Sequence, residues 1–133
     1  VTNGPVPDGC VMAFKIEEKD GKPVLIPAWT SRNMHLPEPP AVANGIVFAV
    51  SNGENALQAN REGRLMDSEE RLQSAPGHAI LYALDAETGK ELYTSGDAMP
   101  GITHFSGIAV SNGRVYVTTF DSTLYSFGLD EAR

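Results

Sequence analysis

The chain has 133 residues, about the length of one domain, and its 41% hydrophobic content is ordinary for a globular protein. Ten Lys and Arg against 17 Asp and Glu give a formal net charge of −7 with no basic run, which excludes the usual charge pattern of proteins that bind nucleic acid or anionic membranes. No apolar run approaches the roughly 18 residues that a membrane span requires. Thirteen Gly and nine Pro, mostly between short apolar alternations, predict many turns and an all-β architecture.

The first two predicted strands form a hairpin. Residues 9–16 (GCVMAFKI) alternate with the two-residue period of a strand, and Asp20-Gly21 supplies a turn. Residues 23–30 then return as a second strand. Pro27 lies inside this strand and has no amide hydrogen, which predicts a position at the edge of a sheet.

A second hairpin follows a proline-rich connection over residues 31–39. Residues 40–43 predict a short strand, and residues 46–51 (IVFAVS) are the most apolar run of the chain. Asn44-Gly45 lies between them. Asn-Gly between apolar runs is the strongest short-range hairpin signal, because both residues tolerate positive φ.

Residues 54–77 interrupt the strand rhythm, and we term them the insertion. Asp67 followed three residues later by Glu70 has the pattern of a helix N-cap with acidic residues in the first turn. The pattern predicts a helix of about two turns over residues 68–75. Such a short helix has little stability in isolation. We therefore expect it to pack Leu72 against another surface of the protein.

The stretch 79–93 (AILYALDAETGKELY) predicts two strands joined by the turn at residues 88–90. Ile80, Tyr82 and Leu84 share one face of the first strand, and the intervening residues share the other.

The last strands repeat earlier ones. Asn44-Gly45 recurs 68 residues later as Asn112-Gly113, and Leu81-Tyr82 recurs 43 residues later as Leu124-Tyr125. Removing the insertion from the longer spacings leaves a period near 43 to 46 residues. A four-stranded propeller blade has a repeat of about 40 to 50 residues, so the period suits this architecture.

The motifs LYALDAETGKELY and GRVYVTTFDSTLYSFG resemble the repeat of the pyrroloquinoline-quinone (PQQ)-like β-propeller superfamily. Its blades read approximately G-x-V-Y-V, then L-Y-A-L-D-x-x-T-G-K, then Trp. The match is specific at residues 81–90 and looser at residues 9–29, and Tyr93 stands where the family usually has Trp. The resemblance implies an all-β chain that forms part of a propeller, with one complete four-stranded blade, two partial blades and a partly helical insertion.

The resemblance also implies the blade boundaries. Residues 9–30 would supply strands C and D of one blade, residues 40–95 a complete blade that carries the insertion 54–77, and residues 107–127 strands A, B and C of the last blade. The chain would be the C-terminal portion of a larger propeller and would contact the remaining blades or self-associate. The family suggests a periplasmic or secreted location.

Strand direction determines which loops share a face of such a propeller. The turns at Asn44-Gly45 and Asn112-Gly113 would lie on one face, whereas the connections between blades and the insertion would lie on the other. Loops held by a rigid sheet are common positions for binding residues. The candidate binding rim on this second face consists of Arg32, Asn33, His35, His104 and Ser106.

More ordinary roles compete with these assignments. A histidine such as His35 or His104 more often bonds a loop carbonyl than a ligand. The histidines lack close metal-ligand spacing and Cys10 is the only cysteine, so neither a zinc site nor an internal disulfide is expected. Residues 69–71 are expected to form a solvated face. Asp85 and Asp121 are expected to form turns and strand ends. Trp29 and Tyr93 are expected to pack between blades.

Three functional classes remain open, and the sequence assigns no catalytic, cofactor-binding or metal-binding residue. The favoured class is a non-catalytic propeller that serves as a scaffold or as a module for binding a protein or other ligand. The alternative is part of a quinoprotein-like dehydrogenase with PQQ and calcium at its centre. Its characteristic cysteine pair and stacking Trp are not recognisable here and would lie in missing blades. The third is a purely structural segment.

Overall fold

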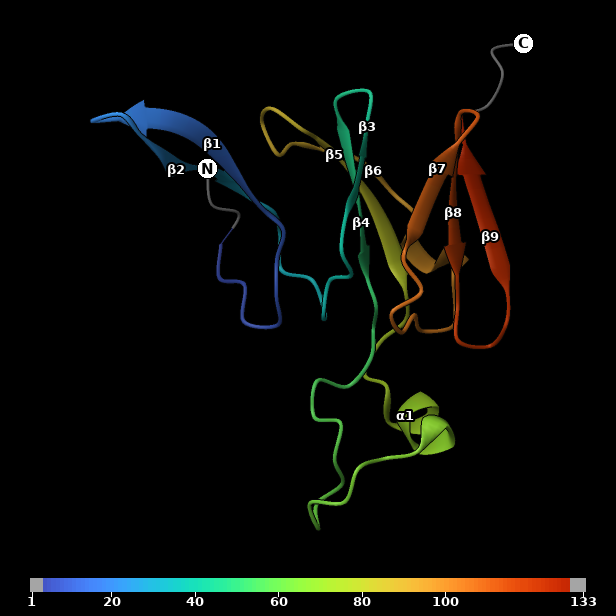
Figure 1. Cartoon of the computed structure of the whole chain (residues 1–133). Coiled ribbons are helices and arrows are strands. Elements are labelled where there is room, and N and C mark those ends of the chain that lie inside the picture. The colour runs from blue at the N-terminus through green and yellow to red at the C-terminus, as the bar shows by residue number, and fades with distance from the viewer. Residues whose placement is uncertain (1–3, 130–133) are drawn as a thin grey trace.

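The computed structural model describes residues 4–129, and it is mostly β, as the sequence predicts. Within this range the strands form three antiparallel sheets in chain order (Figure 1). No helix of the described part has the length and apolar content needed to cross a membrane.

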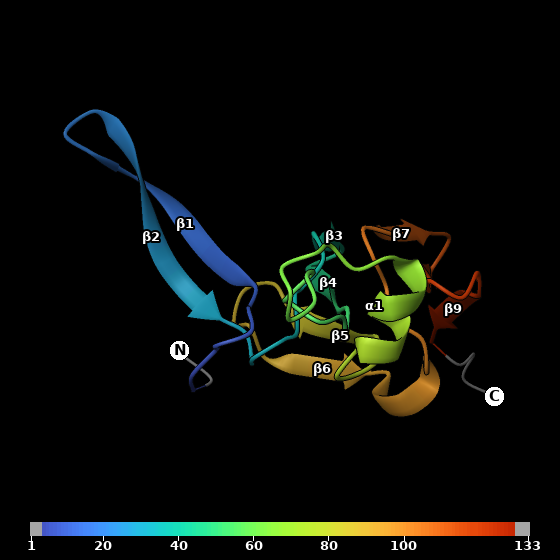
Figure 2. The same cartoon turned by 90° about the horizontal axis from the view of Figure 1, so that it is seen from below.

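The first sheet is a hairpin of β1 (Met12–Lys19) and β2 (Lys22–Thr30). Asp20 and Gly21 have φ angles of 54° and 73°, so they form the predicted turn. β1 starts and ends three residues later than the alternation at residues 9–16 indicated, because pairing continues through the charged residues 17–19, whereas β2 matches the predicted range to within one residue. Pro27 lies beside the register shift in β2, where a missing amide hydrogen is tolerated. Figure 2 shows this hairpin projecting away from the other sheets.

The second sheet has the order β3-β4-β5-β6. Its strands are β3 (Ala41–Ala43), β4 (Ile46–Ser51), β5 (Ile80–Asp85) and β6 (Glu91–Thr94). Asn44 and Gly45 adopt the positive φ angles, 50° and 76°, that the Asn-Gly signal predicted.

The insertion joins β4 to β5 and contains α1 (Ser68–Ser74). The predicted cap is present: the Asp67 side chain accepts a hydrogen bond from the Glu70 amide, and the Glu70 side chain accepts one from the Asp67 amide. The prediction that Leu72 anchors the helix is wrong, because Leu72 is 40% exposed. Arg71 anchors it instead, since its side chain reaches residues outside the helix.

The third sheet has the order β7-β8-β9, with β7 (Ile108–Ser111), β8 (Arg114–Thr118) and β9 (Leu124–Gly128). It follows β6 through a short 3-10 helix, η1 (Gly96–Ala98). Asn112 and Gly113 repeat the turn geometry of Asn44 and Gly45, with φ angles of 50° and 74°.

The middle sheet packs against a neighbouring sheet on each face. Alternate side chains of β4 and β5 divide between two clusters, as the two-residue period predicted for β5. The cluster toward the first hairpin contains Trp29, Met34, Val47, Ala49, Tyr82 and Leu84. The cluster toward the third sheet contains Val50, Ala79, Leu81, Met99, Val115 and Val117.

Trp29 joins the first hairpin to the middle sheet. Its Nε1 donates a hydrogen bond of 3.0 Å to the carbonyl oxygen of Ala86. Its ring lies against Gly89, where an added Cβ would be only 2.6 Å from Trp29 Cδ2. Trp29 therefore packs between sheets, as expected. Tyr93 faces the third sheet, with its ring centroid 6.4 Å from that of Phe127.

The two Asn-Gly turns lie at the same end of the sheets, and the insertion lies at the opposite end (Figure 1). We call this opposite end the loop end. The connections that lead into β3 and β7 also reach the loop end, as do residues 8–9 before β1, so four segments distant in sequence meet there.

Candidate functional site

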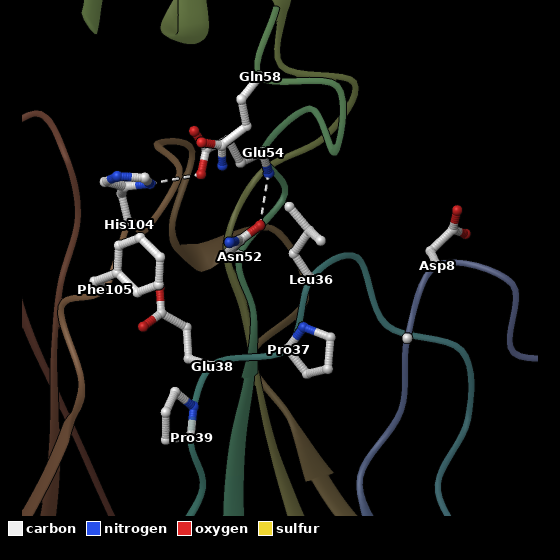
Figure 3. A pocket seen from close by; sticks show the side chains of 11 residues that line it. Asp8, Leu36, Pro37, Glu38, Pro39, Asn52, Glu54, Gln58, His104 and Phe105 are labelled. Carbon is white, nitrogen blue, oxygen red and sulfur yellow. Dashed lines mark hydrogen bonds and ion pairs between the residues drawn. The ribbon is translucent and has the colours of Figure 1, made fainter.

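A pocket of about 410 Å³ opens at the loop end (Figure 3). Small-ligand pockets commonly have volumes of about 300 to 1,000 Å³. We call this cavity the loop-end pocket. Its lining residues are Asp8, Gly9, Leu36, Pro37, Glu38, Pro39, Asn52, Glu54, Gln58, His104 and Phe105.

The connection between β2 and β3 forms one wall and is held against the end of β4. The Glu38 amide donates to the carbonyl oxygen of Val50, and the Asn52 amide donates to that of His35, each at 2.9 Å. Leu36 adopts a φ of 42°, a conformation that costs a non-glycine residue free energy. These bonds fix a strained turn at the pocket wall.

Glu54 enters the pocket from the first turn of the insertion. Its amide donates to Asn52 Oδ1 at 2.8 Å, which fixes the chain just beyond β4. Gly53 has a φ of 77°, and a Cβ there would lie 2.5 Å from the backbone of His78. Only glycine allows this crossing, so the backbone at Gly53 directs Glu54 inward.

Glu54, Arg71 and His104 form a buried polar cluster. Glu54 is only 1% exposed. Its Oε2 lies 2.7 Å from His104 Nδ1, and its Oε1 lies 3.5 Å from Arg71 Nη1. Arg71 Nη1 also lies 3.2 Å from His104 Nε2. Because arginine can only donate, Nε2 accepts and Nδ1–H donates to Glu54, which assigns the histidine tautomer from the bonding network.

Glu38 is the less satisfied carboxylate of the pocket. The residue is 5% exposed, and its Oε1 is buried without a hydrogen-bond partner among the described residues. Its Oε2 accepts only a long bond of 3.5 Å from the Gly107 amide. A buried carboxylate with so few donors carries a desolvation cost that a cation could relieve.

Phe105 stands beside Glu38 at the pocket (Figure 3). It is 83% exposed and has a φ of 51°, so it is a second non-glycine residue of the lining with a left-handed backbone. Strained residues cluster at binding sites in proteins. Leu36 and Phe105 together give the pocket apolar walls beside its carboxylates.

The candidate rim residues divide between the pocket and its surroundings. His104 lines the pocket, but it bonds a carboxylate rather than the loop carbonyl that was the more ordinary expectation. His35 and Asn33 lie just behind the pocket and contact Asp8, with His35 Nε2 3.8 Å from Asp8 Oδ2 and Asn33 Nδ2 2.6 Å from the same oxygen.

The other two rim residues are not brought into the pocket lining. Arg32 pairs with Glu91 at 3.3 Å and lies over the Tyr82 ring. Ser106 is exposed beside Phe105. Burial raises the pKa of Tyr82, and the nearby Arg32 partly offsets this effect.

Sequence reasoning missed Glu38, Glu54 and Arg71. Arg71 was expected on a solvated face, yet it is anchored by Glu54. The available signal for Glu54 was its position directly after Asn52-Gly53, a pair that turns the chain at the end of a strand. Glu38 lies between prolines and carries no comparable signal.

Asp85 and Asp121 are turn residues, as expected. The Thr88 hydroxyl and amide each donate to Asp85 Oδ1 at 2.7 Å. These bonds hold the pKa of Asp85 below its usual value. The Thr119 hydroxyl donates to Asp121 at 2.6 Å and lowers the pKa of that carboxyl in the same way.

No protein-family model matches the chain, and comparisons with curated proteins and with solved structures gave no match. Between residues 4 and 129, no three His, Cys, Asp or Glu side chains gather in a group that could hold a metal ion. The loop-end pocket combines apolar walls, the charge-balanced cluster of Glu54, Arg71 and His104, and the poorly hydrogen-bonded carboxylate of Glu38.

Proposed function

We propose that the chain is a segment of a β-propeller and acts as a non-catalytic binding module. The observation that carries this proposal is the loop-end pocket, which is assembled from connections that precede or follow strands of all three sheets. Segments that join successive sheets meet at one end in a propeller, and such loops are common positions for binding residues.

The packing of the sheets supports the propeller architecture. Successive sheets contact one another through apolar clusters on both faces of the middle sheet. The first strands of the second and third sheets, β3 and β7, lie against each other. This side-by-side order is what a propeller requires around its axis.

The cluster of Glu54, Arg71 and His104 favours a binding role over catalysis. Both oxygens of Glu54 have partners, and His104 is held between Glu54 and Arg71. A general base or nucleophile must be free to reach a reacting atom. These three side chains instead stabilise the insertion against the segment that leads into β7.

PQQ does not fit this pocket. The cofactor is itself a polycarboxylate, whereas the lining presents the carboxylates of Asp8 and Glu38, which no Lys or Arg of the lining balances. Like charges would repel at this site. A dehydrogenase role for a longer parent protein would thus depend on groups outside these residues.

The outer edge of β9 is expected to pair with another strand, from the rest of the propeller or from a second copy. An open edge presents unpaired amide and carbonyl groups and promotes association. Size-exclusion chromatography with light scattering tests this expectation on the full chain. A stable compact monomer would contradict the propeller proposal.

The binding role is tested by NMR titration of the ¹⁵N-labelled full chain with a panel of small cationic, neutral and anionic fragments. We expect backbone amide shifts confined to Leu36, Glu38, residues 52–58 and residues 104–105. The turns at Asn44-Gly45 and Asn112-Gly113 are the internal control, since they lie at the opposite end of the sheets. A folded chain whose loop end responds to no fragment of any charge would refute the binding role.

A further inference from the structure

We propose that the loop-end pocket binds a primary alkylammonium group, with Glu38 as its anion. This inference rests on the proposed binding role of the loop end and names the chemical class of the ligand. It follows from the charge of the pocket, the unsatisfied carboxylate and the character of the walls.

Glu38 is a carboxylate of the pocket whose charge no neighbouring Lys or Arg in the described part of the chain balances. Arg71 lies 3.5 Å from Glu54 and balances the charge of that carboxylate. The Glu38 carboxylate has no such partner: its one hydrogen bond is the long contact to the Gly107 amide, and its Oε1 is buried and unpaired within residues 4–129. Asp8 adds a second carboxylate to the lining. The pocket therefore favours a cation over a neutral or anionic ligand.

The walls select an organic cation rather than a hydrated metal ion. Leu36, Pro37, Pro39 and Phe105 line the cavity with apolar surface. Divalent cations such as Ca²⁺ take six to eight oxygen ligands, and apolar walls cannot supply them. An alkyl chain gains free energy by burial against such walls, while its ammonium head donates to a carboxylate.

The shape of the site favours a small head group. Glu38 is 5% exposed and, among the described residues, only its Oε1 is free, since Oε2 accepts from the Gly107 amide, so the site suits a single-point ammonium better than a guanidinium that bonds both oxygens. Phe105 lies next to the Glu38 side chain and is 83% exposed (Figure 3). An aromatic ring at this position also attracts cations through its π face.

Matched four-carbon probes test the proposal on the full chain by NMR titration. They are n-butylammonium, 1-butanol and butyrate, which share the alkyl stem and differ in charge, with n-butylguanidinium as the test of head shape. We expect saturable shifts at residues 36–39 and 104–105 with n-butylammonium, and weaker binding of the other three. Tighter binding of the alcohol, the carboxylate or the guanidinium would overturn the alkylammonium assignment. The binding role itself would then stand, because the pocket would still hold a ligand.

Two variants test the role of individual residues. Glu38→Gln keeps the shape and removes the charge, so n-butylammonium affinity should fall at least about tenfold, as for loss of one charge-assisted hydrogen bond. Glu62→Gln, an exposed change in the insertion, is the matched control and should leave the affinity unchanged. Phe105→Ala alters an exposed side chain and should weaken binding without unfolding the chain. Unchanged affinity in a folded Glu38→Gln variant would overturn the proposal.

The ammonium could come from a free amine or from a lysine side chain. Titration with cadaverine and with Nα-acetyl-lysine amide separates these sources. Tighter binding of cadaverine assigns the pocket to a free amine, whereas tighter binding of the lysine derivative assigns it to a peptide. Failure of both to bind a folded chain would overturn the inference.

Discussion

Replacing Gly89 by alanine should separate the first hairpin from the middle sheet. Gly89 has a φ of 72°, and a Cβ at this position would lie 2.6 Å from Trp29 Cδ2. The new methyl group and the indole ring cannot both keep their places. Trp29 would have to move and would lose its hydrogen bond to the Ala86 carbonyl.

The matched control is Gly113→Ala. Gly113 has nearly the same φ, 74°, but an added Cβ there meets no atom within 4 Å. Both variants should lose about 1 to 2 kcal/mol of folding free energy from the left-handed backbone. Gly89→Ala should lose roughly a further 3 kcal/mol, about 1 from the hydrogen bond and the rest from exposing around half of a Trp side chain.

Urea unfolding of both variants measures this difference, and fluorescence reports its cause. Trp29 is the only tryptophan of the chain, so its emission senses its surroundings directly. We expect a red shift in Gly89→Ala and no shift in Gly113→Ala. Equal losses of stability with unshifted emission would refute the inferred packing of Trp29 on the turn.

Two further predictions concern carboxylates. Glu54→Gln should reduce the free energy of unfolding by about 2 kcal/mol, below the 3 to 5 kcal/mol typical of a fully buried pair because its partners are partly exposed. Urea titration against Glu62→Gln measures this loss, and equal stability of the two variants would contradict it. Asp85→Asn should destabilise the chain at neutral pH, because the folded-state pKa of Asp85 lies below its unfolded value. That stabilisation is complete above the usual Asp pKa of about 3.9 and disappears as the pH falls through the lower folded value. The unfolding midpoints of wild type and Asp85→Asn should therefore converge in acid, whereas a gap that persists below the folded pKa would argue against the Thr88 hydrogen bonds as its cause.

Much of the fold could be predicted because its signals are local. Positive φ at Asn44-Gly45 and Asn112-Gly113 follows from the residues themselves, and these turns set the pairing of their strands. The division of β5 side chains between two cores follows from the period of a strand. The capping box of α1 was similarly readable from Asp67 and Glu70.

The pocket could be predicted only in part because its contacts are long-range. Glu54 and His104 are 50 residues apart, and the contact of Glu38 with the Gly107 amide spans 69 residues. Strand direction brought the correct loops to one end, yet it carried no information on which side chains turn inward. The inward turn of Glu54 depends on the close crossing of Gly53 with His78, which is a tertiary contact.

That crossing also brings the two ends of the insertion together. The Gly77 amide donates to the Gly53 carbonyl at 3.2 Å, so the segment leaves and re-enters the sheet through a single narrow neck. Beyond the neck, lengthening a flexible loop costs only about 0.6 kcal/mol for each doubling of its length. The insertion can therefore vary in length outside the residues that line the pocket or contact His104 while the pairing of β4 with β5 stays unchanged.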